Sequence, residues 1–465
     1  MSYDLLIKNG TIVNAEEIYQ ANLYIHNGKI EVITNKDIPV SAKDVINAEG
    51  KYVFPGFIDT HVHSRDPGAT YKEDFYHSTM AAAAGGVSTI FEMPNTNPPI
   101  NNVENFQKQV ANLESKAFVD FGIWAICLGH LNIHEIRNLQ EAGAIGFKFF
   151  WGYAVHSKTF QLMYNYKSGM EDVIPPFSDG EVYEMFREVA KTGQVFAIHA
   201  ENNDLIQHLT QKVESRNGQT YLDLLEGRPS LAEALTIQTG IAMAKDTGTR
   251  LHILHVSSEE GIKLVRQAQK EGYPITAETC PHYLFLSAEE YDQVGSQMKV
   301  YPPVKFKKDQ EALWKAIGEG TISLVCSDHA PHTEEEKDGD LWSIPAGMCG
   351  VETLAPLMLN AASEGKIKLQ DITRLLSEGP AKLFNIYPKK GSIRIGADAD
   401  ITIVDMEKES IIKREKLHSK SKVTAYDCFR IKGVPVQTIV RGTTVMKEGK
   451  IIGQPQGKLV TPRLN

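Results

Sequence analysis

Between about residues 55 and 375 the chain alternates short apolar runs with longer amphipathic stretches. One amphipathic stretch, 181–191, leads into the apolar run 195–198, and another, 261–269, leads into 275–277. Brief apolar runs of this kind are typical of buried strands, and the stretches between them are typical of helices. Their repeated alternation predicts βα units around a parallel sheet.

Both ends of the chain have a different pattern, in which short strand-like segments are separated by turn residues. An early predicted turn is Asn9-Gly10, and a late one is Arg441-Gly442. Because 465 residues are more than one ordinary core needs, we expect a barrel-sized domain with a smaller companion. The predicted division is a small β-sandwich domain from residues 1–54 and 376–465 around a central domain of residues 55–375.

The composition is 42% hydrophobic and 23% charged, which is ordinary for a soluble globular protein. With 49 Lys and Arg against 58 Asp and Glu, the net charge of −9 argues against binding to nucleic acid or to an anionic membrane. The five cysteines include no CxxC pair, and no apolar run reaches the ~18 residues of a membrane span. We therefore expect a cytoplasmic protein without disulfides.

Side chains that commonly bind metals directly follow several of the predicted strands. The carboxyl ends of the strands of a (β/α)8 barrel meet on one face, where the active site of this fold is built, so side chains from distant segments can surround one point. Two histidines that stand two residues apart at a strand end point the same way and can share a metal. The candidates are His61 and His63 after the run 54–60, Lys148 after 144–147, His199 after 195–198, His255 after 251–254 and Asp328 after 322–327.

Each candidate alone also has a plain structural explanation. A single histidine after a strand is more often a hydrogen-bonded loop residue than a ligand, and Asp328 could cap a loop. Lys148, between Phe147 and Phe149, is unusual because burying a cation is costly, but its ammonium group could reach solvent. The joint occurrence of all six residues at successive strand ends favours a metal site in a (β/α)8 barrel.

The chain resembles the cyclic amidohydrolases, the family of dihydroorotase, allantoinase and dihydropyrimidinase (hydantoinase), most clearly at Pro55-Gly56-Phe57-Ile58-Asp59-Thr60-His61-Val62-His63. The resemblance extends over essentially the whole chain. It implies a (β/α)8 barrel with a terminal β-sandwich and two divalent metal ions, for which zinc is the family expectation. By the same resemblance, one ion is bound by His61, His63 and Asp328, the other by His199 and His255, and both are bridged by Lys148 carboxylated by CO₂.

The implied reaction is hydrolysis of a ring amide or ureide. A protonated lysine, with a pKa of about 10.4, is a poor ligand, whereas its carbamate is an anion able to span two metals about 3.5–4 Å apart. The apolar neighbours of Lys148 favour the neutral amine that reacts with CO₂. The metals lower the pKa of a shared water, and Asp328 takes its proton and then gives it to the departing ring nitrogen.

Three motifs resemble dihydroorotase in particular, and they contain Arg65, Asn95 and His332. In the family, the matching Arg and Asn hold the substrate carboxylate and the matching His contacts the ring. An arginine beside the metals suits an anionic substrate, which it grips through paired hydrogen bonds. The alternative for Arg65 is a salt bridge to Asp66 or Glu73.

Other segments, 146–150 and the long irregular loop 153–176, resemble allantoinase and hydantoinase. Tyr153 is similar to the hydantoinase tyrosine that stabilises the oxyanion. Gly347 lies in a glycine segment that contacts the ring in the family, or that forms a helix-entry turn. Tyr301 departs from all three branches, because dihydroorotases usually have Asn there and the other two have Ser or a small residue. A bulky phenol at this position would reshape the pocket floor. We favour dihydroorotase-like hydrolysis of a carboxylate-bearing ring, with allantoinase and then hydantoinase as alternatives.

Two other classes of protein fit parts of the pattern. Some relatives of dihydropyrimidinase have lost their ligands and act as non-catalytic interaction proteins, which the full ligand set here disfavours. A mononuclear deaminase on the same barrel also begins with His-x-His but does not need a carboxylated Lys148. The expected partners are a small cyclic ureide and, because relatives are dimers or tetramers, further copies of the chain. No nucleic acid or membrane partner is expected.

Overall fold

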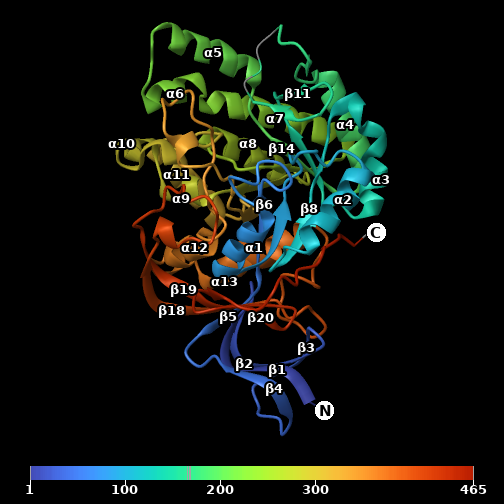
Figure 1. Ribbon diagram of the computed structural model, residues 1–465, viewed down its shortest axis with the longest axis vertical. Coiled ribbons are helices and arrows are strands. Elements are labelled where there is room, and N and C mark those ends of the chain that lie inside the picture. Colours follow the sequence, from blue (N-terminus) through green and yellow to red (C-terminus); the bar gives the residue numbers. More distant parts are fainter. Residues whose placement is uncertain (1, 165, 167–168, 464–465) are drawn as a thin grey trace.

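The chain adopts the predicted (β/α)8 barrel with a β domain built from both termini (Figure 1). The structure, a computed structural model, describes residues 2–164, 166 and 169–463. The barrel strands are parallel neighbours in two arcs, and a bridge between Val62 and His329 joins them. The first arc is β6 (Phe57–Val62), β7 (Val87–Glu92) and β8 (Asp120–Ile123), and the second is β9 (Ala125–Ile126), β10 (Phe147–Phe150), β14 (Val195–His199), β15 (Arg250–Ile253), β16 (Thr276–Thr279) and β17 (Leu324–Val325).

Helices follow the strands and cover the outside of the barrel (Figure 1). Their ends follow from the sequence, as in α4, where Ser178 and Glu181 form a capping box and Gly193 ends the helix in the left-handed conformation. None of the described helices has the length and apolar character needed to cross a membrane. The helices are α1 (Phe75–Ala84), α2 (Val103–Glu114), α3 (Ile136–Ala142), α4 (Asp179–Thr192), α5 (Asn203–Ser215), α6 (Tyr221–Gly227), α7 (Ser230–Thr247), α8 (Glu259–Lys270), α9 (Pro281–Phe285), α10 (Tyr291–Val294), α11 (Lys307–Gly318), α12 (Leu354–Ser363), α13 (Leu369–Thr373) and α14 (Gly379–Leu383).

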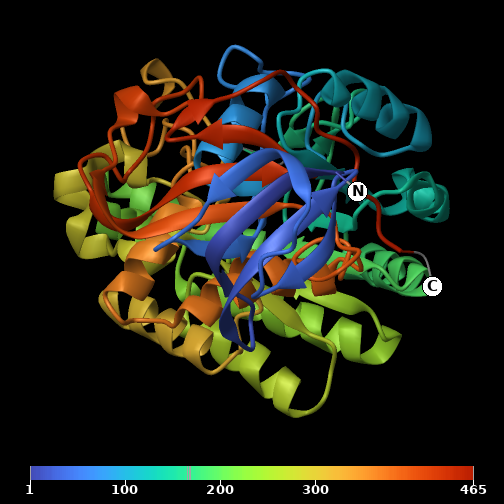
Figure 2. The ribbon, with the colours of Figure 1, turned by 90° about the horizontal axis from the view of Figure 1, so that it is seen from below.

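Strands from both termini join in one nine-stranded sheet, which lies against one end of the barrel (Figure 2). Its strands are β1 (Ser2–Val13), β2 (Ile18–His26), β3 (Lys29–Thr34), β4 (Ser41–Asn47), β5 (Tyr52–Pro55), β18 (Ile401–Ile411), β19 (Arg430–Val440), β20 (Thr443–Lys447) and β21 (Lys450–Ile451). β5 of the N-terminal part pairs with β18 of the C-terminal part. The exact domain boundaries stay a prediction.

The turn predicted at Asn9-Gly10 is wrong, because the chain continues through it as the single strand β1. Asn9 has a φ of 59°, and the pairing of β1 with β2 shifts register between Ile7 and Gly10. A Cβ at Gly10 would lie 2.6 Å from Val53 Cγ2, so the glycine allows β5 to pack closely. The Asn-Gly pair therefore makes a β-bulge instead of a hairpin.

The irregular loop predicted at 153–176 contains a small three-stranded sheet of β11 (Ala154–His156), β12 (Leu162–Met163) and β13 (Val173–Ile174). Part of this loop, residues 165 and 167–168, lies outside the described residues. Tyr153 and Tyr164 from the loop line a cavity at the carboxyl ends of the barrel strands. The predicted position over the barrel mouth is therefore the observed one.

Candidate metal centre and substrate cavity

All six predicted ligand residues line one cavity of about 380 Å³ at the carboxyl ends of the barrel strands. The structure thus brings together five distant segments, and the metal-binding roles of their side chains stay predictions. His61 lies in β6 and His63 directly follows it, Lys148 lies in β10, His199 ends β14, His255 follows β15 and Asp328 follows β17.

Their polar atoms converge on the centre of the cavity. Lys148 Nζ lies 3.1 Å from His61 Nε2, which is 3.2 Å from Asp328 Oδ1. His63 Nε2 lies 3.6 Å from the same carboxylate oxygen. The ligand atoms of both histidines and the aspartate lie within 4.8 Å of one another, a spacing that a metal ion can bridge.

The outward nitrogens of His61 and His63 are held by other side chains. His61 Nδ1 lies 2.7 Å from Glu278 Oε1, and His63 Nδ1 lies 2.8 Å from Asn95 Oδ1. A carboxylate or amide oxygen on one ring nitrogen fixes the proton there and leaves the other nitrogen as a lone pair. Both histidines therefore present Nε2 to the centre of the cluster.

His199 and His255 form the other half of the cluster, with His199 Nδ1 lying 3.0 Å from His255 Nε2. His199 Nε2 lies 3.1 Å from Glu201 Oε2 and 3.5 Å from the Tyr153 hydroxyl. His255 Nδ1 is buried and has no hydrogen-bond partner among the described residues. Two facing imidazole nitrogens can share only one proton, so a cation that accepts both lone pairs fits this arrangement. The residues present therefore suit divalent metal ions.

Burial shifts the pKa values of the cluster toward the neutral forms of its bases. It lowers the pKa of Lys148 from 10.5 to about 8, against the opposing effect of Asp328 and Glu278. It also lowers the pKa values of His63 and His255 well below 6.5, and nearby cations add to this effect. Neutral imidazole is the form that binds metals, and neutral amine is the form that reacts with CO₂.

Arg65 lies at the cavity wall, with Nε donating to the Pro331 carbonyl at 3.3 Å. Within the described part of the chain it forms no ion pair with a carboxylate. Asp66 pairs instead with Lys116 at 2.7 Å, and Glu73 accepts from backbone N–H groups. Arg65 therefore does not form the alternative salt bridge to Asp66 or Glu73.

The remaining predicted substrate contacts surround the same cavity. The Asn95 amide, whose oxygen faces His63, donates from Nδ2 to the Tyr164 hydroxyl at 2.9 Å. Gly347 has a φ of 136°, and a Cβ there would lie 2.4 Å from the Ala330 carbonyl oxygen, so this close approach requires glycine. The other four predicted substrate-binding residues, Asn95, Tyr153, His332 and Gly347, all line the cavity together with Arg65.

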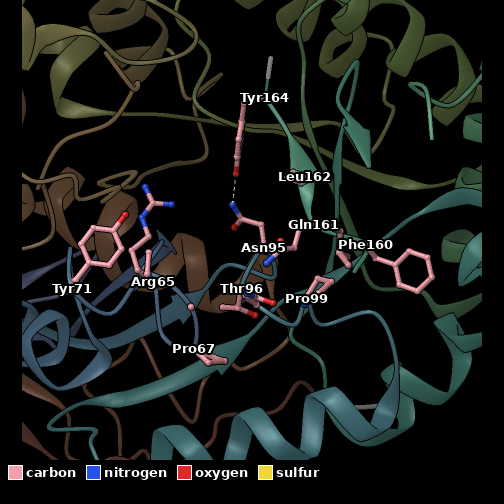
Figure 3. Close-up of a pocket in the computed structure, with 14 residues that line it drawn as sticks. Arg65, Pro67, Tyr71, Asn95, Thr96, Pro99, Phe160, Gln161, Leu162 and Tyr164 are labelled. Carbon is pink, nitrogen blue, oxygen red and sulfur yellow. Dashed lines mark hydrogen bonds between the residues drawn. The ribbon is translucent and has the colours of Figure 1, made fainter. Parts of the chain in front are cut away.

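A second cavity, of about 390 Å³, adjoins the first (Figure 3). The two share Arg65, Asn95 and Tyr164 in their walls. Figure 3 shows the Tyr164 hydroxyl pointing toward Asn95, from the opposite wall. The hydrogen bond between these two side chains therefore lies in the wall that the two cavities share.

Sequence reasoning missed Glu278, Glu201 and Arg228. Glu278 is fully buried in the strand β16, and Glu201 follows His199 by two residues, so a carboxylate in or just after a strand was the available signal. Burial alone would raise the pKa of Glu201, but Arg228 and His199 hold it down, to about 2. Arg228 comes from the loop after α6, and its approach to the cluster has no signal in the sequence pattern.

Comparison with known proteins agrees with this geometry. The model of the amidohydrolase family matches residues 52–451. This chain belongs to the amidohydrolase family. The enzyme is thus a hydrolase that acts on C–N bonds of cyclic amides, as its full-length relatives indicate, and the predicted family is confirmed.

Three curated relatives match this amidohydrolase over nearly its whole length. The L-hydantoinase of Paenarthrobacter aurescens is 34% identical, over 99% of this chain and 98% of that protein. An allantoinase of Desulfitobacterium hafniense is 34% identical over 99% of both chains, and a dihydroorotase of Methanosarcina acetivorans is 34% identical over 97% and 94%. The solved L-hydantoinase (dihydropyrimidinase) from Arthrobacter aurescens has a TM-score of 0.92 at 33% identity, over 99% of this chain and 100% of that one.

These matches support the hydantoinase and allantoinase alternatives better than the dihydroorotase reading that the sequence motifs favoured. Hydantoinases and allantoinases recur among the relatives and solved structures. The three dihydroorotase-like motifs contain Arg65, Asn95 and His332, but Asn95 is already hydrogen-bonded to His63 and Tyr164. The predicted homo-oligomer stays a prediction.

Proposed function

We propose that this amidohydrolase opens the ring of a cyclic ureide of the hydantoin or allantoin class. The observation that carries the proposal is the convergence of four histidines, an aspartate and a buried lysine in the wall of one cavity. A volume of about 380 Å³ suits a small-molecule ligand. Aromatic side chains beside the cluster offer flat apolar contacts to a planar ring, namely Phe150, Tyr153, Tyr301 and Trp342.

In this proposal the cluster holds two divalent metal ions, with zinc as the family expectation. Such ions supply Lewis acidity, which polarises a carbonyl and lowers the pKa of water toward neutrality. His61, His63 and Asp328 would hold one ion and His199 and His255 the other. Lys148, carboxylated by CO₂, would contact both, and its burial between these groups favours the neutral amine that the carboxylation needs.

Asp328 is the proposed catalytic base and acid. Its carboxylate reaches both His61 and His63 and faces the cavity. From this position it can accept a proton from the attacking water and pass the proton to the ring nitrogen as the C–N bond breaks. The Tyr153 hydroxyl, which lies beside His199, would donate a hydrogen bond to the carbonyl oxygen as negative charge develops there.

A second candidate is a ring that carries a carboxylate, as in dihydroorotate. The observation that favours it is Arg65, a cavity-lining guanidinium without a carboxylate partner among the described residues. Such a group can pair with a substrate carboxylate through two parallel hydrogen bonds. Dihydroorotate therefore has to be compared directly with the uncharged rings.

The test is steady-state turnover of the metal-loaded enzyme on hydantoin, allantoin, dihydrouracil and dihydroorotate, before and after Arg65→Met. We expect an uncharged five-membered ring to be preferred and its kcat/KM to change by less than about 10-fold in the variant, because lost uniform contacts cost little. Preference for dihydroorotate, with a loss of about 100-fold or more in Arg65→Met, would establish the second candidate. Arg137→Met, at an exposed site on α3, is the control for charge removal. A loaded enzyme inactive on all four rings would contradict both candidates.

A further inference from the structure

Tyr301, the residue that departs from the family pattern, lies against a buried arginine. The Arg228 guanidinium carbon is 3.5 Å from the centre of the Tyr301 ring, a distance typical of a strong cation–π contact. Tyr301 lines the substrate cavity. Arg228, whose side chain is only 14% exposed, therefore packs against the part of the cavity wall that Tyr301 forms.

Arg228 also donates hydrogen bonds from two of its nitrogens to the Glu201 carboxylate. Nε donates to Glu201 Oε1 at 3.3 Å and Nη2 donates to Oε2. This forked contact fixes the plane of the carboxylate and compensates its charge, which matters because Glu201 is 3% exposed. Glu201 Oε2 is in turn the acceptor nearest to His199 Nε2, at 3.1 Å.

The chain of contacts sets which nitrogen His199 can offer to a metal. With the proton held on Nε2 by Glu201, Nδ1 is a lone pair that faces His255 Nε2. His255 has no comparable support, because its Nδ1 lacks a partner among the described residues. The orientation of this half of the cluster therefore depends on His199, and hence on Glu201 and Arg228.

The other half of the cluster has independent support. His61 is held by Glu278, which is fully buried and also contacts His252 and Thr60. His63 is held by Asn95. None of the hydrogen bonds and ion pairs of these groups within the described residues involves Arg228 or Glu201. Loss of Arg228 should thus affect the two halves unequally.

We propose that Arg228, clamped between Glu201 and Tyr301, is a positioning residue that orients His199 and so links the floor of the substrate cavity to occupancy of the second metal position. The inference rests on the two-metal centre proposed above. Arg228 touches neither the proposed metals nor the reacting atoms, and acts only through Glu201 and Tyr301. Replacing it leaves Glu201 buried without its counter-charge, free to turn away from His199.

The test is metal binding to metal-free protein, measured by zinc titration with counting of bound equivalents, for the wild type, Arg228→Met and Glu201→Gln. We expect the wild type to bind two equivalents. In both variants the first equivalent keeps its affinity and the second binds about 10- to 100-fold more weakly, as is typical when an outer partner of a metal-binding histidine is lost. Arg216→Met is the matched control, because Arg216 also pairs with two carboxylates but at the surface of the neighbouring helices.

Tyr301→Leu keeps the Arg228–Glu201 pair and removes only the stacked ring, so it remains informative if Arg228→Met fails to fold. We expect a smaller loss at the second equivalent together with a raised KM, because Tyr301 also lines the cavity. Thermal unfolding of metal-free and zinc-loaded protein separates positioning from plain structural support. If Arg228 positions His199, zinc raises the Tm of the variants less than it raises the Tm of the wild type. If Arg228 only supports the fold, its replacement lowers the Tm of the metal-free and of the zinc-loaded protein equally.

The results separate failure of this inference from failure of the proposed function. A wild type that binds no zinc would overturn the metal centre itself. Wild-type binding of two equivalents with unchanged affinities in Arg228→Met and Glu201→Gln would overturn the positioning role alone. Equal weakening of both equivalents would also overturn it, because the inference assigns Arg228 to one half of the cluster.

Discussion

Two buried polar clusters lie at opposite ends of the barrel strands, and they are built differently. The carboxyl-end cluster is the set of six proposed metal ligands that line the cavity. The amino-end cluster lies where β8 begins against the terminal sheet, and consists of Asp120, Lys390, Asp398, Asp400 and Arg441.

The amino-end cluster is complete without a ligand. Lys390 Nζ lies 2.5 Å from Asp120 and Asp400 carboxylate oxygens and 3.2 Å from Asp398. Arg441 also pairs with Asp120, and a third cation, from Lys29, pairs with Asp398 at 3.1 Å. The three carboxylates could hold a metal by their spacing alone, but the Lys390 ammonium group already takes that place. Three cations balance three anions here.

The carboxyl-end cluster instead leaves lone pairs directed at one another, as between His199 and His255. Buried charge alone therefore does not mark a functional site. A cluster whose groups satisfy one another has a structural role, whereas one whose acceptors converge on a cavity needs a ligand. Removing a lysine from each cluster tests this contrast.

Lys148→Ala is expected to have the largest effect on activity, a loss of about 10⁴-fold or more, as for removal of a residue central to catalysis. Bound metal falls with it, because the proposed bridging ligand is lost. The free energy of unfolding of the metal-free protein should not decrease, since burial disfavours the Lys148 cation. Activity and metal content are measured with and without acetate or propionate, which are expected to restore part of both. Full activity of the variant without added acid would contradict the bridging role.

Lys390→Met is expected to act in the opposite way. It leaves three buried carboxylates without their shared cation, and removing one partner of a buried ion pair typically costs about 3–5 kcal/mol of unfolding free energy. Lys390 is 1% exposed, so solvent cannot replace the lost contacts. Urea unfolding of the metal-free protein measures the loss. Folded variant should still bind two zinc equivalents, and loss of metal without loss of stability would break the contrast between the clusters.

The positions of the proposed metal ligands could be predicted from the sequence because two local facts combine. His199 and His255 directly follow short apolar runs, and the ends of parallel barrel strands converge. The contacts that support these residues could not be predicted, because Glu278 meets His61 and Arg228 meets Glu201 only through packing of distant elements. Arg65 shows the same limit, since its place beside the proposed metal ligands followed from the motif, but its lack of a carboxylate partner among the described residues did not.

The amino-end cluster could not be predicted from the sequence, for a related reason. Asp398 and Asp400 stand in a Gly-Ala-Asp-Ala-Asp segment that reads as a turn before a strand. Nothing local shows that Asp120, nearly 280 residues earlier, lies beside them. The order of strands within each part of the fold follows from hydrophobic pattern, but contacts between the two parts depend on tertiary packing.

Lys337 is an intermediate case, a buried cation whose ammonium group has only carbonyl partners in the described part of the chain, at Lys299, Pro345 and Gly347. Burial lowers its pKa to about 7, and nearby Lys299 adds to the effect. Because the unfolded lysine titrates near 10.4, the unfolded state binds more protons between these values, so this group makes the protein more stable as pH rises from 7 toward 10, by at most about 1.4 kcal/mol per pH unit. Urea unfolding at pH 7, 8 and 9 should show that Lys337→Met lacks this rise, whereas the exposed control Lys263→Met keeps it. Equal slopes in all three proteins would show that carbonyl oxygens alone suffice to keep a buried lysine charged.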